Sequence, residues 1–508
     1  MNGILFRDVR LLDLAAPKGM TSICALRTKN GRIHEIAPTL VPNAGEDVIE
    51  GNGNLLMPGL INGHFHSSVT HMKGRLPGLP LEIFMLYECP ELEVLRPTPR
   101  EAYLRTMLGC IEMLKTGTTA VQDDCFFVPE PEPEIIDAVM QAYTDSGIRA
   151  RVALDQPELS ELEKLPYLTE MLPDDQRRQM SLPSRTKSQT LLALYDHLIN
   201  RWHGTADGRI KAAVSCSAPQ RVSPGYFSAL DDLSQRHDLP HYAHMLETKL
   251  QRVFGEECLN GRSLVQYTKD LGLLSDRMNI IHSIWVDDKD LDLIAASGAS
   301  IAHNPISNLR LGSGVMPFRA IRDRGIPVCL GVDEAIADDA INMWSVMKTA
   351  GMIHNLSGWD YENWPSATEI LTAATVGGGH AMREPGLGSM ALGAPADLVL
   401  LNLKTLPFTP LNNLQRQLVH CELGTSVLAV MVSGRLVVQE NRLIHVDEES
   451  LVGEARMLFE EKSDAFERAD KAVSKLLPHY RRMYHKAATV DVGMERRLEV
   501  FTRDKAIL

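Results

Sequence analysis

Paired cysteines are missing from the sequence. The eight cysteines stand alone at positions 24, 89, 110, 125, 216, 258, 329 and 421, and none forms a C-x-x-C pair. This distribution argues against a disulfide framework and against a cysteine-based zinc site, and it is typical of a reducing compartment. We therefore expect a cytoplasmic protein.

An excess of positive charge is missing too. Acidic residues number 65 and basic residues 52, which gives a formal net charge of −13. A protein that binds the phosphate backbone of a nucleic acid needs a basic face. The sequence also lacks the P-C-x-x-C segment that accompanies H-x-E in the zinc deaminases of nucleic-acid bases. We therefore expect no nucleic-acid partner.

Long hydrophobic runs are equally scarce. No uninterrupted apolar run is long enough to span a bilayer, and the first residues, MNGILFRDVRLLDLAAPKG, show no basic head followed by an apolar core. We expect no membrane partner and no secretory signal. The share of apolar residues, 44%, and of charged residues, 23%, is that of an ordinary soluble enzyme. A length of 508 residues predicts two domains, or one large α/β barrel with additional parts.

Short apolar runs, each followed by a segment of helical spacing, recur along the middle of the chain. Val, Ile and Ala dominate these runs, as is typical of strands that are buried on both faces. Eight strands alternating with helices predict a (β/α)₈ TIM barrel over residues 57–384. The predicted strands are 57–66, 118–124, 149–155, 210–216, 241–246, 278–283, 300–304 and 326–333.

The parts outside the predicted barrel differ in pattern. Residues 1–56 and 385–447 contain short strand-like runs joined by turns, and we expect them to form one small β-sandwich built from both termini. Residues 448–508 have helical periodicity and many charges, which predicts a helical C-terminal extension that packs on the barrel or on a neighbouring subunit. The polar insertion 156–209 is either a lid or a surface excursion.

Histidines and a carboxylate end several of the predicted strands. Alternation along a strand places His64 and His66 on one face, about 6.6 Å apart, and other strands end in His244, His282 and Asp333. Active sites of such barrels lie at the carboxyl ends of the strands. Three or more imidazoles with a carboxylate suit one divalent ion, Zn²⁺ in the first place, with Fe²⁺ or Mn²⁺ as alternatives.

Glu247 lies three residues beyond His244, in the segment HMLE. A carboxylate beside a metal-activated water can take up a proton and return it to the leaving group. Glu247 is therefore our candidate for the proton shuttle. The alternative is an ordinary surface glutamate in the loop after the fifth strand.

These segments resemble the amidohydrolase superfamily, within it the branch of cytosine, guanine and S-adenosylhomocysteine deaminases and triazine hydrolases. The resemblance implies one divalent metal per subunit and a homo-oligomer. It also implies His64, His66, His244 and Asp333 as ligands, Glu247 as proton shuttle, and His282 beside the attacking hydroxide, which Asp333 also binds. The segments that carry the resemblance are MPGLINGHFH (57–66), HMLET (244–248), IIHS (280–283), HNPISNLRLGSG (303–314), GVD (331–333) and GAPADLVLL (393–401).

Several departures from the branch bear on the metal count and the substrate. Lys211 stands at the beginning of the fourth strand and not at its end, which argues against the binuclear members with a bridging carboxylated lysine. Glu334 follows Asp333 where relatives often have Gly, Cys216 begins C-S-A-P where adenosine-type relatives have P-H-A-P, and Phe84 replaces a Trp. These differences favour a compact nitrogen heterocycle over a large nucleoside.

Four polar residues are candidate substrate contacts. Gln122 ends the second predicted strand and either binds substrate or fixes loops. Gln220 and Arg221 follow the fourth strand and either hold a polar ring substituent or form a surface salt bridge. His303 ends the seventh strand, where we expect it to line the pocket.

Metal-dependent hydrolysis is the predicted function. The first hypothesis is an aminohydrolase in which a metal-activated hydroxide attacks a ring carbon of a small nitrogen heterocycle. Glu247 protonates the ring nitrogen and then the departing ammonia, while His282 stabilises the developing charge. A second hypothesis keeps the site but removes chloride or an alkylamine, as triazine hydrolases do. A third is a non-catalytic assembly protein, which the filled ligand positions argue against.

Overall fold

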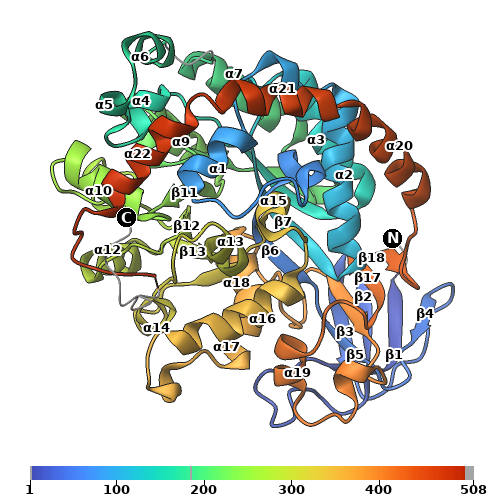
Figure 1. Cartoon of the computed structure of the whole chain (residues 1–508). Coiled ribbons are helices and arrows are strands. Elements are labelled where there is room, and N and C mark those ends of the chain that lie inside the picture. Colours follow the sequence, from blue (N-terminus) through green and yellow to red (C-terminus); the bar gives the residue numbers. More distant parts are fainter. Residues whose placement is uncertain (1–2, 183–185, 498–508) are drawn as a thin grey trace.

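The computed structural model describes residues 3–182 and 186–497, in which strands and helices alternate around two parallel sheets (Figure 1). One sheet has the order β15-β6-β7-β8-β9, and the other has the order β10-β11-β12-β13-β14. Each strand range expected from the sequence contains a strand of these sheets. Their bounds are β6 Leu60–His66, β7 Thr118–Cys125, β8 Arg149–Leu154, β9 Ile210–Ala212, β10 Val214–Ser215, β11 His241–Met245, β12 Met278–His282, β13 Ser300–His303, β14 Val328–Leu330 and β15 Asp333–Glu334.

Two segments of the chain belong to both sheets. Residues 210–215 pair with β8 through β9 and with β11 through β10. Residues 328–334 pair with β13 through β14 and with β6 through β15. The fourth and eighth predicted strands are therefore each interrupted, and not continuous as we expected.

Gly331 explains the interruption of the eighth strand. A Cβ atom at this position would lie 2.4 Å from Oδ1 of Asn304 and 2.9 Å from the backbone nitrogen of His64. The next residue, Val332, donates its backbone N–H to Oδ1 of Asn62 over 3.0 Å and not to a strand. Close approach to β6 thus replaces regular pairing at this point, and only a residue without a side chain fits there.

Strands from both ends of the chain form a third sheet of nine strands, with the order β19-β18-β17-β16-β5-β1-β2-β3 and with β4 beside β1. The joining of residues from both termini is as expected, whereas the two-layered sandwich stays a prediction. The strands are β1 Ile4–Leu11, β2 Cys24–Lys29, β3 Arg32–Ala37, β4 Asp47–Glu50, β5 Leu55–Pro58, β16 Leu398–Leu401, β17 Val427–Val432, β18 Arg435–Gln439 and β19 Arg442–Leu443.

The passage from the third sheet into the parallel strands occurs at Gly59, a little later than the expected boundary at residue 57. Residues 55–58 pair with β16 and residues 10–11, whereas Leu60 already pairs with β7. A Cβ atom on Gly59 would lie 2.1 Å from Oγ1 of Thr119. The first predicted strand is therefore divided between two sheets.

Helices surround the parallel strands and cover the chain between them (Figure 1). Helix α2 (Pro99–Lys115) follows Thr98, whose side chain accepts a hydrogen bond from the backbone N–H of Glu101. The helices before the third sheet is completed are α1 Leu81–Glu88, α2 Pro99–Lys115, α3 Pro133–Ser146, α4 Glu161–Lys164, α5 Leu168–Met171, α6 Asp174–Met180, α7 Ser188–Trp202, α8 Thr205–Gly208, α9 Pro224–His237, α10 Lys249–Cys258, α11 Leu264–Asp270, α12 Asp288–Ser297, α13 Pro305–Arg310, α14 Phe318–Asp323, α15 Ala335–Asp338, α16 Met343–Ile353, α17 Ala367–Ala374, α18 Val376–Ala381 and α19 Leu414–His420. Short 3₁₀ segments include η1 Ser67–Met72, η2 Glu93–Leu95 and η3 Pro219–Arg221.

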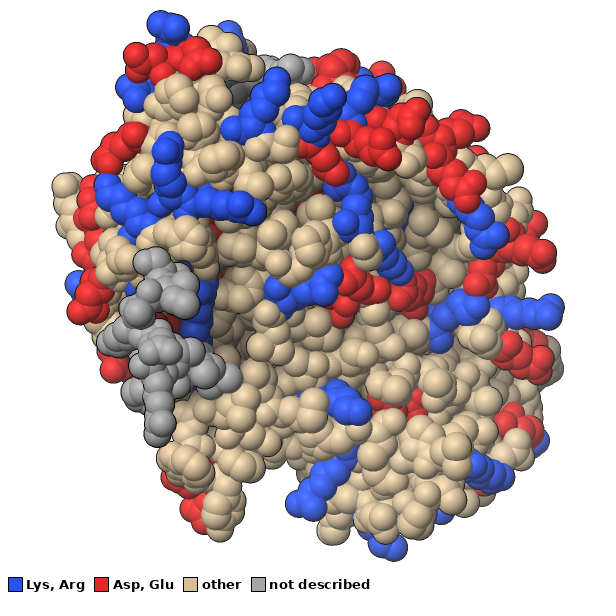
Figure 2. Space-filling model, in the orientation of Figure 1, with Lys and Arg blue, Asp and Glu red and all other residues tan. Residues whose placement is uncertain are grey.

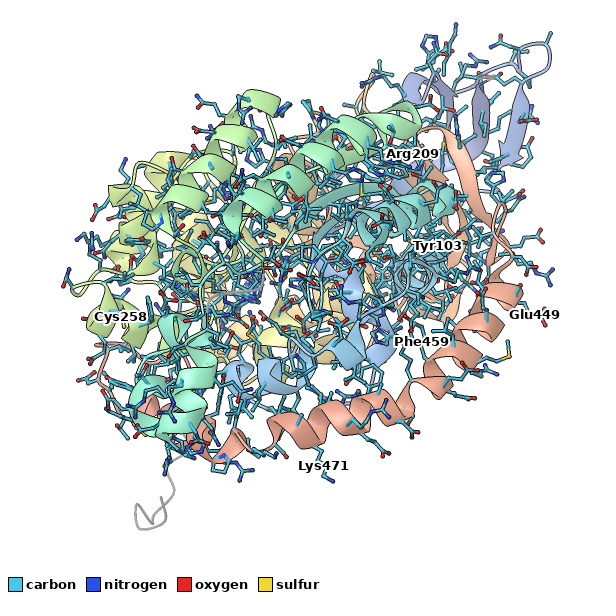
Figure 3. The ribbon with its side chains drawn as sticks, turned by 90° about the horizontal axis from the view of Figure 1, so that it is seen from above. Tyr103, Arg209, Cys258, Glu449, Phe459 and Lys471 are labelled. Atoms are coloured by element: carbon cyan, nitrogen blue, oxygen red, sulfur yellow. The ribbon has the colours of Figure 1, made fainter. Side chains whose placement is uncertain are left out.

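The expected C-terminal extension is helical over α20 Glu448–Glu461, α21 Ser463–Val473 and α22 Leu477–Ala488, while residues 498–508 lie outside the described residues. These helices run along one side of the molecule, past α2 and α1 (Figure 1). Acidic side chains gather over α20 and α21 on the visible face (Figure 2). Phe459 points from the helix toward the body of the molecule, whereas Lys471 points away (Figure 3).

The insertion 156–209 packs against this extension. It holds α4 to α8, with residues 183–185 outside the described part of the chain. His479 of α22 lies 2.7 Å from the carbonyl oxygen of Met171, and Lys486 lies 2.6 Å from Glu170. Within residues 3–182 and 186–497, no helix has the length and apolar character needed to cross a membrane.

Candidate metal centre

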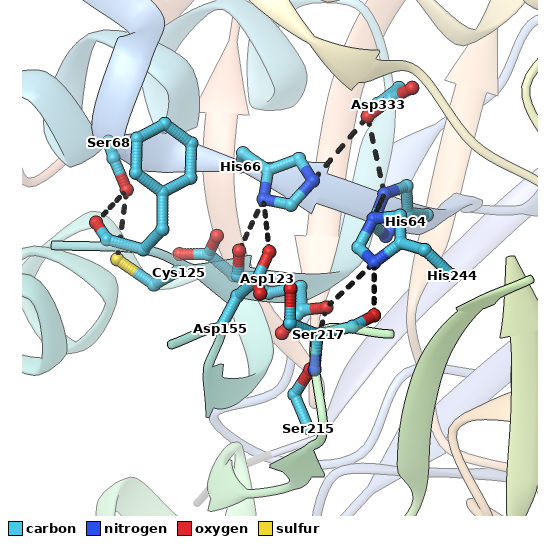
Figure 4. A network of polar contacts seen from close by, with 12 residues as sticks. His64, His66, Ser68, Asp123, Cys125, Asp155, Ser215, Ser217, His244 and Asp333 are labelled. Carbon is cyan, nitrogen blue, oxygen red and sulfur yellow. Dashed lines mark hydrogen bonds and ion pairs between the residues drawn. The ribbon is translucent and has the colours of Figure 1, made fainter. Parts of the chain in front are cut away.

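The two histidines at the end of β6 meet side chains from the ends of β11 and β15 (Figure 4). Nε2 of His64 lies 3.3 Å from Nε2 of His244 and 3.2 Å from Oδ1 of Asp333. Nε2 of His66 lies 3.5 Å from the same carboxylate oxygen. The four residues that the sequence resemblance implies as ligands thus point their donor atoms at one place.

The outer ring nitrogens of two of these histidines are fixed by backbone carbonyl groups. Nδ1 of His66 contacts the carbonyl oxygen of Asp124, and Nδ1 of His244 lies 2.7 Å from the carbonyl oxygen of Ser217. A carbonyl oxygen accepts a hydrogen bond, so each Nδ1 carries the proton. Each Nε2 then keeps a lone pair for a cation, which is the usual arrangement around metal-binding imidazoles.

Burial sets the charges of the ligand set. It lowers the pKa of His64 to about 4 and the pKa of His244 well below its ordinary value, so both imidazoles are neutral at pH 7. Burial alone would raise the pKa of Asp333, but the hydrogen bond with His64 and the neighbouring imidazoles hold it below its ordinary value. Neutral imidazoles with one carboxylate are the protonation states that bind a divalent cation.

Glu247 and His282 lie beside the ligands. Oε2 of Glu247 is 3.4 Å from Nε2 of His282, which is itself 3.8 Å from Oδ2 of Asp333. Glu247 is 2% exposed, and its Oε1 has no hydrogen-bond partner within the described residues. Burial, reinforced by the charge of Asp333, raises the pKa of Glu247 well above its ordinary value. A buried carboxyl with a raised pKa is suited to give and take a proton near neutrality.

The backbone at these positions adopts an unusual conformation. Leu246, His282 and Asp333 have φ angles of 54°, 75° and 74°, in the left-handed region that residues other than glycine rarely occupy. Left-handed turns redirect the chain as each strand ends. Such costly conformations concentrate at functional sites, where surrounding contacts hold them.

Two residues of α13, the helix after β13, support the site from behind. Ser307 donates its hydroxyl to Oδ2 of Asp333 over 2.6 Å, and Asn308 places Oδ1 2.9 Å from Nδ1 of His282. Neither side chain was among the site residues expected from the sequence. Asp155, whose Oδ2 lies 3.9 Å from Nδ1 of His66, also joins the cluster and was not among the expected site residues. Its one signal in the sequence was its place at the end of the third predicted strand.

The candidate substrate contacts are distributed differently. Gln122 is buried and donates Nε2–H to the carbonyl oxygen of Gly63 in β6 over 3.0 Å. The ring nitrogens of His303 and His354 approach to 3.0 Å in the interior. Gln220 has a buried Oε1 without a partner in the described part of the chain. Contact of these residues with a substrate stays a prediction.

Among the described residues, Arg221 has contacts other than the surface salt bridge that was its alternative role. Its guanidinium donates to Oγ of Ser217 over 3.1 Å and contacts Sδ of Met85 at 3.2 Å. Ser217 in turn holds His244 through its carbonyl oxygen. Arg221 is thus a positive group close to the ligand set.

Further carboxyl groups lie near the ligands and were not expected from the sequence. Glu88 of α1 is 6% exposed, and burial raises its pKa to about 7. Burial and the nearby charges of Glu88 and Asp333 also raise the pKa of Glu334. Glu82 accepts a hydrogen bond of 2.5 Å from Thr248. The site is therefore richer in acids than its six expected metal-binding and catalytic residues imply.

The donor set fits a divalent metal. Three imidazoles and a carboxylate converge within the interior, and their donor atoms fall into groups within 4.8 Å of one another. Imidazole nitrogen and carboxylate oxygen atoms are the kinds of ligand that zinc takes in catalytic sites.

The model of the amidohydrolase family matches residues 55–437. This chain belongs to that family. The 5′-deoxyadenosine deaminase of Methanothermobacter thermautotrophicus is 30% identical over 420 residues, which are 83% of this chain and 90% of the relative. The 5-methylthioadenosine/S-adenosylhomocysteine deaminase of Nitratidesulfovibrio vulgaris is 30% identical over 456 residues, 89% of this chain and 96% of the relative. The family resemblance inferred from the sequence is confirmed.

Solved amidohydrolase structures agree with the fold. A zinc-bound adenosine deaminase from Xanthomonas campestris has a TM-score of 0.77 at 25% identity and covers 90% of this chain and 98% of its own. A zinc-bound atrazine chlorohydrolase from Arthrobacter aurescens has a TM-score of 0.78 at 23% identity and covers 90% and 99%. With the parallel sheets described above, these likenesses indicate an α/β fold of the TIM-barrel type. The family match ends before α20, so the C-terminal helices lie beyond it.

Proposed function

We propose that this amidohydrolase is a metal-dependent deaminase that replaces the exocyclic amino group of a nitrogen heterocycle with oxygen and releases ammonia. The observation that carries the proposal is the buried carboxyl of Glu247, 3.4 Å from His282, directly beside four convergent ligand side chains. Water adds to the ring carbon, the carbon–nitrogen bond to the amino group breaks, and the products are the oxo heterocycle and ammonia.

His64, His66, His244 and Asp333 would hold one divalent cation, Zn²⁺ in the first place and Fe²⁺ as the alternative. When bound, the cation supplies a Lewis acid that lowers the pKa of water toward neutrality. The proposal of a single ion rests on the number of converging ligands. Lys211 supports it, because its side chain forms an ion pair of 2.6 Å with Glu384. Lys211 lies at the beginning of the fourth predicted strand, and not at the end where a lysine would bridge two metal ions.

Glu247 moves the protons. Its raised pKa allows it to carry a proton near pH 7, which it delivers to the ring nitrogen beside the reacting carbon. The proton that it delivers comes from the attacking water. As an ionised group it then accepts the second proton of that water and passes it to the departing amino group, so that both water protons end on nitrogen and Glu247 returns to its starting state. The partner-free Oε1 is the atom available for this transfer.

His282 and Asp333 orient the reacting groups. Nδ1 of His282 is held by Asn308, so that Nε2 faces Glu247 and the Asp333 carboxylate. In this position the imidazole stabilises charge that develops on the incoming oxygen. Ser307 fixes one oxygen of Asp333, which leaves the other directed at the histidine ligands.

The choice of substrate weighs two observations against each other. Phe84, Cys216 and Glu334 depart from the pattern of adenosine-type relatives and favour a compact ring. The relatives named above, at 30% identity, deaminate 5′-deoxyadenosine and related nucleosides. We place adenine nucleosides first and free amino-substituted rings second. Loss of chloride or an alkylamine is the alternative reaction.

Three finer features of the molecule are also part of this proposal. The two segments shared by the parallel sheets support closure of these sheets into one barrel. Strands from both termini support a small sandwich beside it. The scattered cysteines support a location in the cytoplasm, and the family resemblance supports assembly as a homo-oligomer.

A panel assay tests the proposal. Zinc-loaded protein is incubated with 5′-deoxyadenosine, S-adenosylhomocysteine, free purines, pterins and triazines, and released ammonia, chloride and alkylamine are measured together. We expect ammonia from one ring class. Release of chloride or alkylamine without ammonia would contradict the deaminase proposal and support the alternative reaction, hydrolysis of another ring substituent.

A further inference from the structure

A small cavity lies directly beside the metal centre. It measures about 30 Å³ and is bordered by η1, the end of α1, α2, the loop after β7 and α21. Phe126 lines the cavity, and its ring centroid is 5.6 Å from that of His66. About 10 to 15 Å³ hold one water molecule, so the cavity has room for a group of about the size of a carboxylate.

A guanidinium group without a partner lines this cavity. Arg105 of α2 makes no hydrogen bond and no ion pair with any described residue, and its buried Nε is unsatisfied. The Cζ atom of Arg105 lies 5.9 Å from the ring centroid of Phe459. Burial lowers the pKa of Arg105 to about 10, which still leaves it charged at pH 7. The carboxylate of Glu101 acts on this charge without forming an ion pair with it. A partly buried charge without a hydrogen-bonded counterion is costly, so its presence requires an explanation.

An imidazole in the same lining is also unsatisfied. Both ring nitrogens of His71 are buried without a hydrogen-bond partner in the described part of the chain. The ring packs against Phe459 with a centroid distance of 4.6 Å. Burial and the charges of Arg105 and Lys462 lower the pKa of His71, so it is neutral and offers one N–H donor.

The other cations around the cavity are compensated. Lys462 forms an ion pair of 2.6 Å with Glu101, and Arg75 forms one of 2.6 Å with Asp470. Glu88 also lines the cavity, but its hydrogen bond and its charge interactions are with Glu334 and with the ligands at the metal centre. Arg105 is therefore the one excess positive charge among these described groups.

The C-terminal extension builds one wall of the cavity. Lys462 and Phe466 line it, and Phe459 covers Arg105 and His71. These three residues lie beyond residue 437, where the family match ends. The family portion of the chain thus supplies the guanidinium and the imidazole, whereas the extension closes the space around them.

We propose that this cavity is a subsite for one anionic group of carboxylate size, carried by the substrate at a distance from the reacting ring. Arg105 is its charged donor, and His71 is its neutral donor. The inference rests on the proposed function, since it assigns the far end of a substrate whose ring is held at the metal centre. It adds a class of substrate to that function: a heterocycle with an acidic side chain.

The first arm of the test measures anion binding without turnover. Thermal unfolding of the zinc-loaded full chain is followed in acetate and in its neutral analogue acetamide, at constant ionic strength. We expect acetate, but not acetamide, to raise the Tm of the wild type, because a ligand of the folded state stabilises it. Arg105→Met should abolish this shift, and without acetate its Tm should equal or exceed that of the wild type, since the substitution removes an uncompensated buried charge.

Arg100→Met is the matched control. Arg100 lies on the same helix and also contacts the extension, through an exposed ion pair with Glu454 of 2.5 Å. We expect this variant to keep the acetate shift. An acetate shift that survives in Arg105→Met would overturn the role of Arg105, and so would a wild type without any shift.

The second arm identifies the source of the anion. The substrates are 5′-deoxyadenosine derivatives with a 5′-thioether chain that ends in a carboxylate or in the matching carboxamide. We expect kcat/KM to favour the carboxylate by about ten- to hundredfold, the range for a hydrogen bond to a charged group. In Arg105→Met this ratio should fall to about one.

The outcomes separate the two proposals. Equal turnover of both derivatives by the wild type, together with an acetate shift, would assign the cavity to a free anion and overturn the substrate assignment. A preference that persists in Arg105→Met would also overturn it. If neither derivative releases ammonia, the choice of adenine nucleosides fails, and if no ring of the panel releases ammonia, the proposed deaminase function fails. In both cases the Arg105-dependent acetate shift still decides whether the cavity binds anions.

Discussion

At the scale of single residues, the chemistry depends on which side chains carry a proton at neutral pH. The pKa of His64 is lowered to about 4, whereas the pKa of Glu247 is raised, and both shifts arise from burial. The same interior thus gives neutral imidazoles for a cation and a carboxyl that carries a proton. Environments that push the pKa values of neighbouring groups apart are typical of acid–base sites.

Glu247→Gln tests the proton shuttle. The amide has nearly the same shape but cannot exchange protons, so we expect kcat to fall by about 10² to 10⁴, with the metal content unchanged. Ammonia release and metal analysis on the same preparation provide the measurement.

The matched control for that variant is Glu256→Gln on α10. The side chain of Glu256 is 41% exposed and is not among the proposed metal ligands or catalytic residues. It should retain full activity. A Glu247→Gln variant with the kcat of the wild type would refute the assignment, whatever its metal content.

The residues of the site were only partly predictable from the sequence. His64, His66, His244, His282 and Asp333 were found because each ends an apolar run, and parallel strands gather their carboxyl ends at one edge. Ser307 and Asn308 were not among the expected site residues, because their hydrogen bonds reach Asp333 and His282 on other strands. Arg105 gave no signal, since its cavity forms only when the C-terminal helices pack on α2.

At the scale of elements, the strands were predictable and their interruptions were not. The composition of each run predicts burial, but the break between β14 and β15 depends on how closely β6 passes. Gly331 shows this dependence, because Asn304 and the backbone of His64 occupy the space that a side chain at this position would need. The order of residues along the chain does not predict how closely two strands approach each other.

Gly331→Ala tests the importance of this approach. The added Cβ would meet Oδ1 of Asn304 at 2.4 Å, so the strand end that carries His64 must move. Overpacking of this kind costs about 1 to 3 kcal/mol, and displacement of a ligand should also weaken metal binding. Thermal unfolding and competition with a chelator measure the two effects.

Gly358→Ala is the control for this substitution, because a Cβ atom there would meet nothing within 4 Å. It should leave both the Tm and the metal affinity near the values of the wild type. A Gly331→Ala variant that behaves like this control would show that the close approach to β6 is not required.

At the scale of the whole molecule, segments far apart in the sequence cooperate around one centre. The nine-stranded sheet joins both ends of the chain, and the C-terminal extension returns to α2 through the ion pair of Lys462 with Glu101. The division of the chain into domains stays a prediction, whereas the helical character of the C-terminal extension could be expected from its periodicity. The contribution of the extension to a cavity beside the metal centre could not, because it follows from packing alone.

Metal-dependent ammonia release tests the central claim most directly. Protein stripped with a chelator and then reloaded with increasing Zn²⁺ is assayed with 5′-deoxyadenosine and with the other rings of the panel. We predict that ammonia release is absent from the stripped protein and rises in proportion to bound zinc, up to about one ion per chain, the number expected for a single site of four ligands. Ammonia release that is equal with and without metal, or a fully loaded protein that releases none from any ring, would contradict the account.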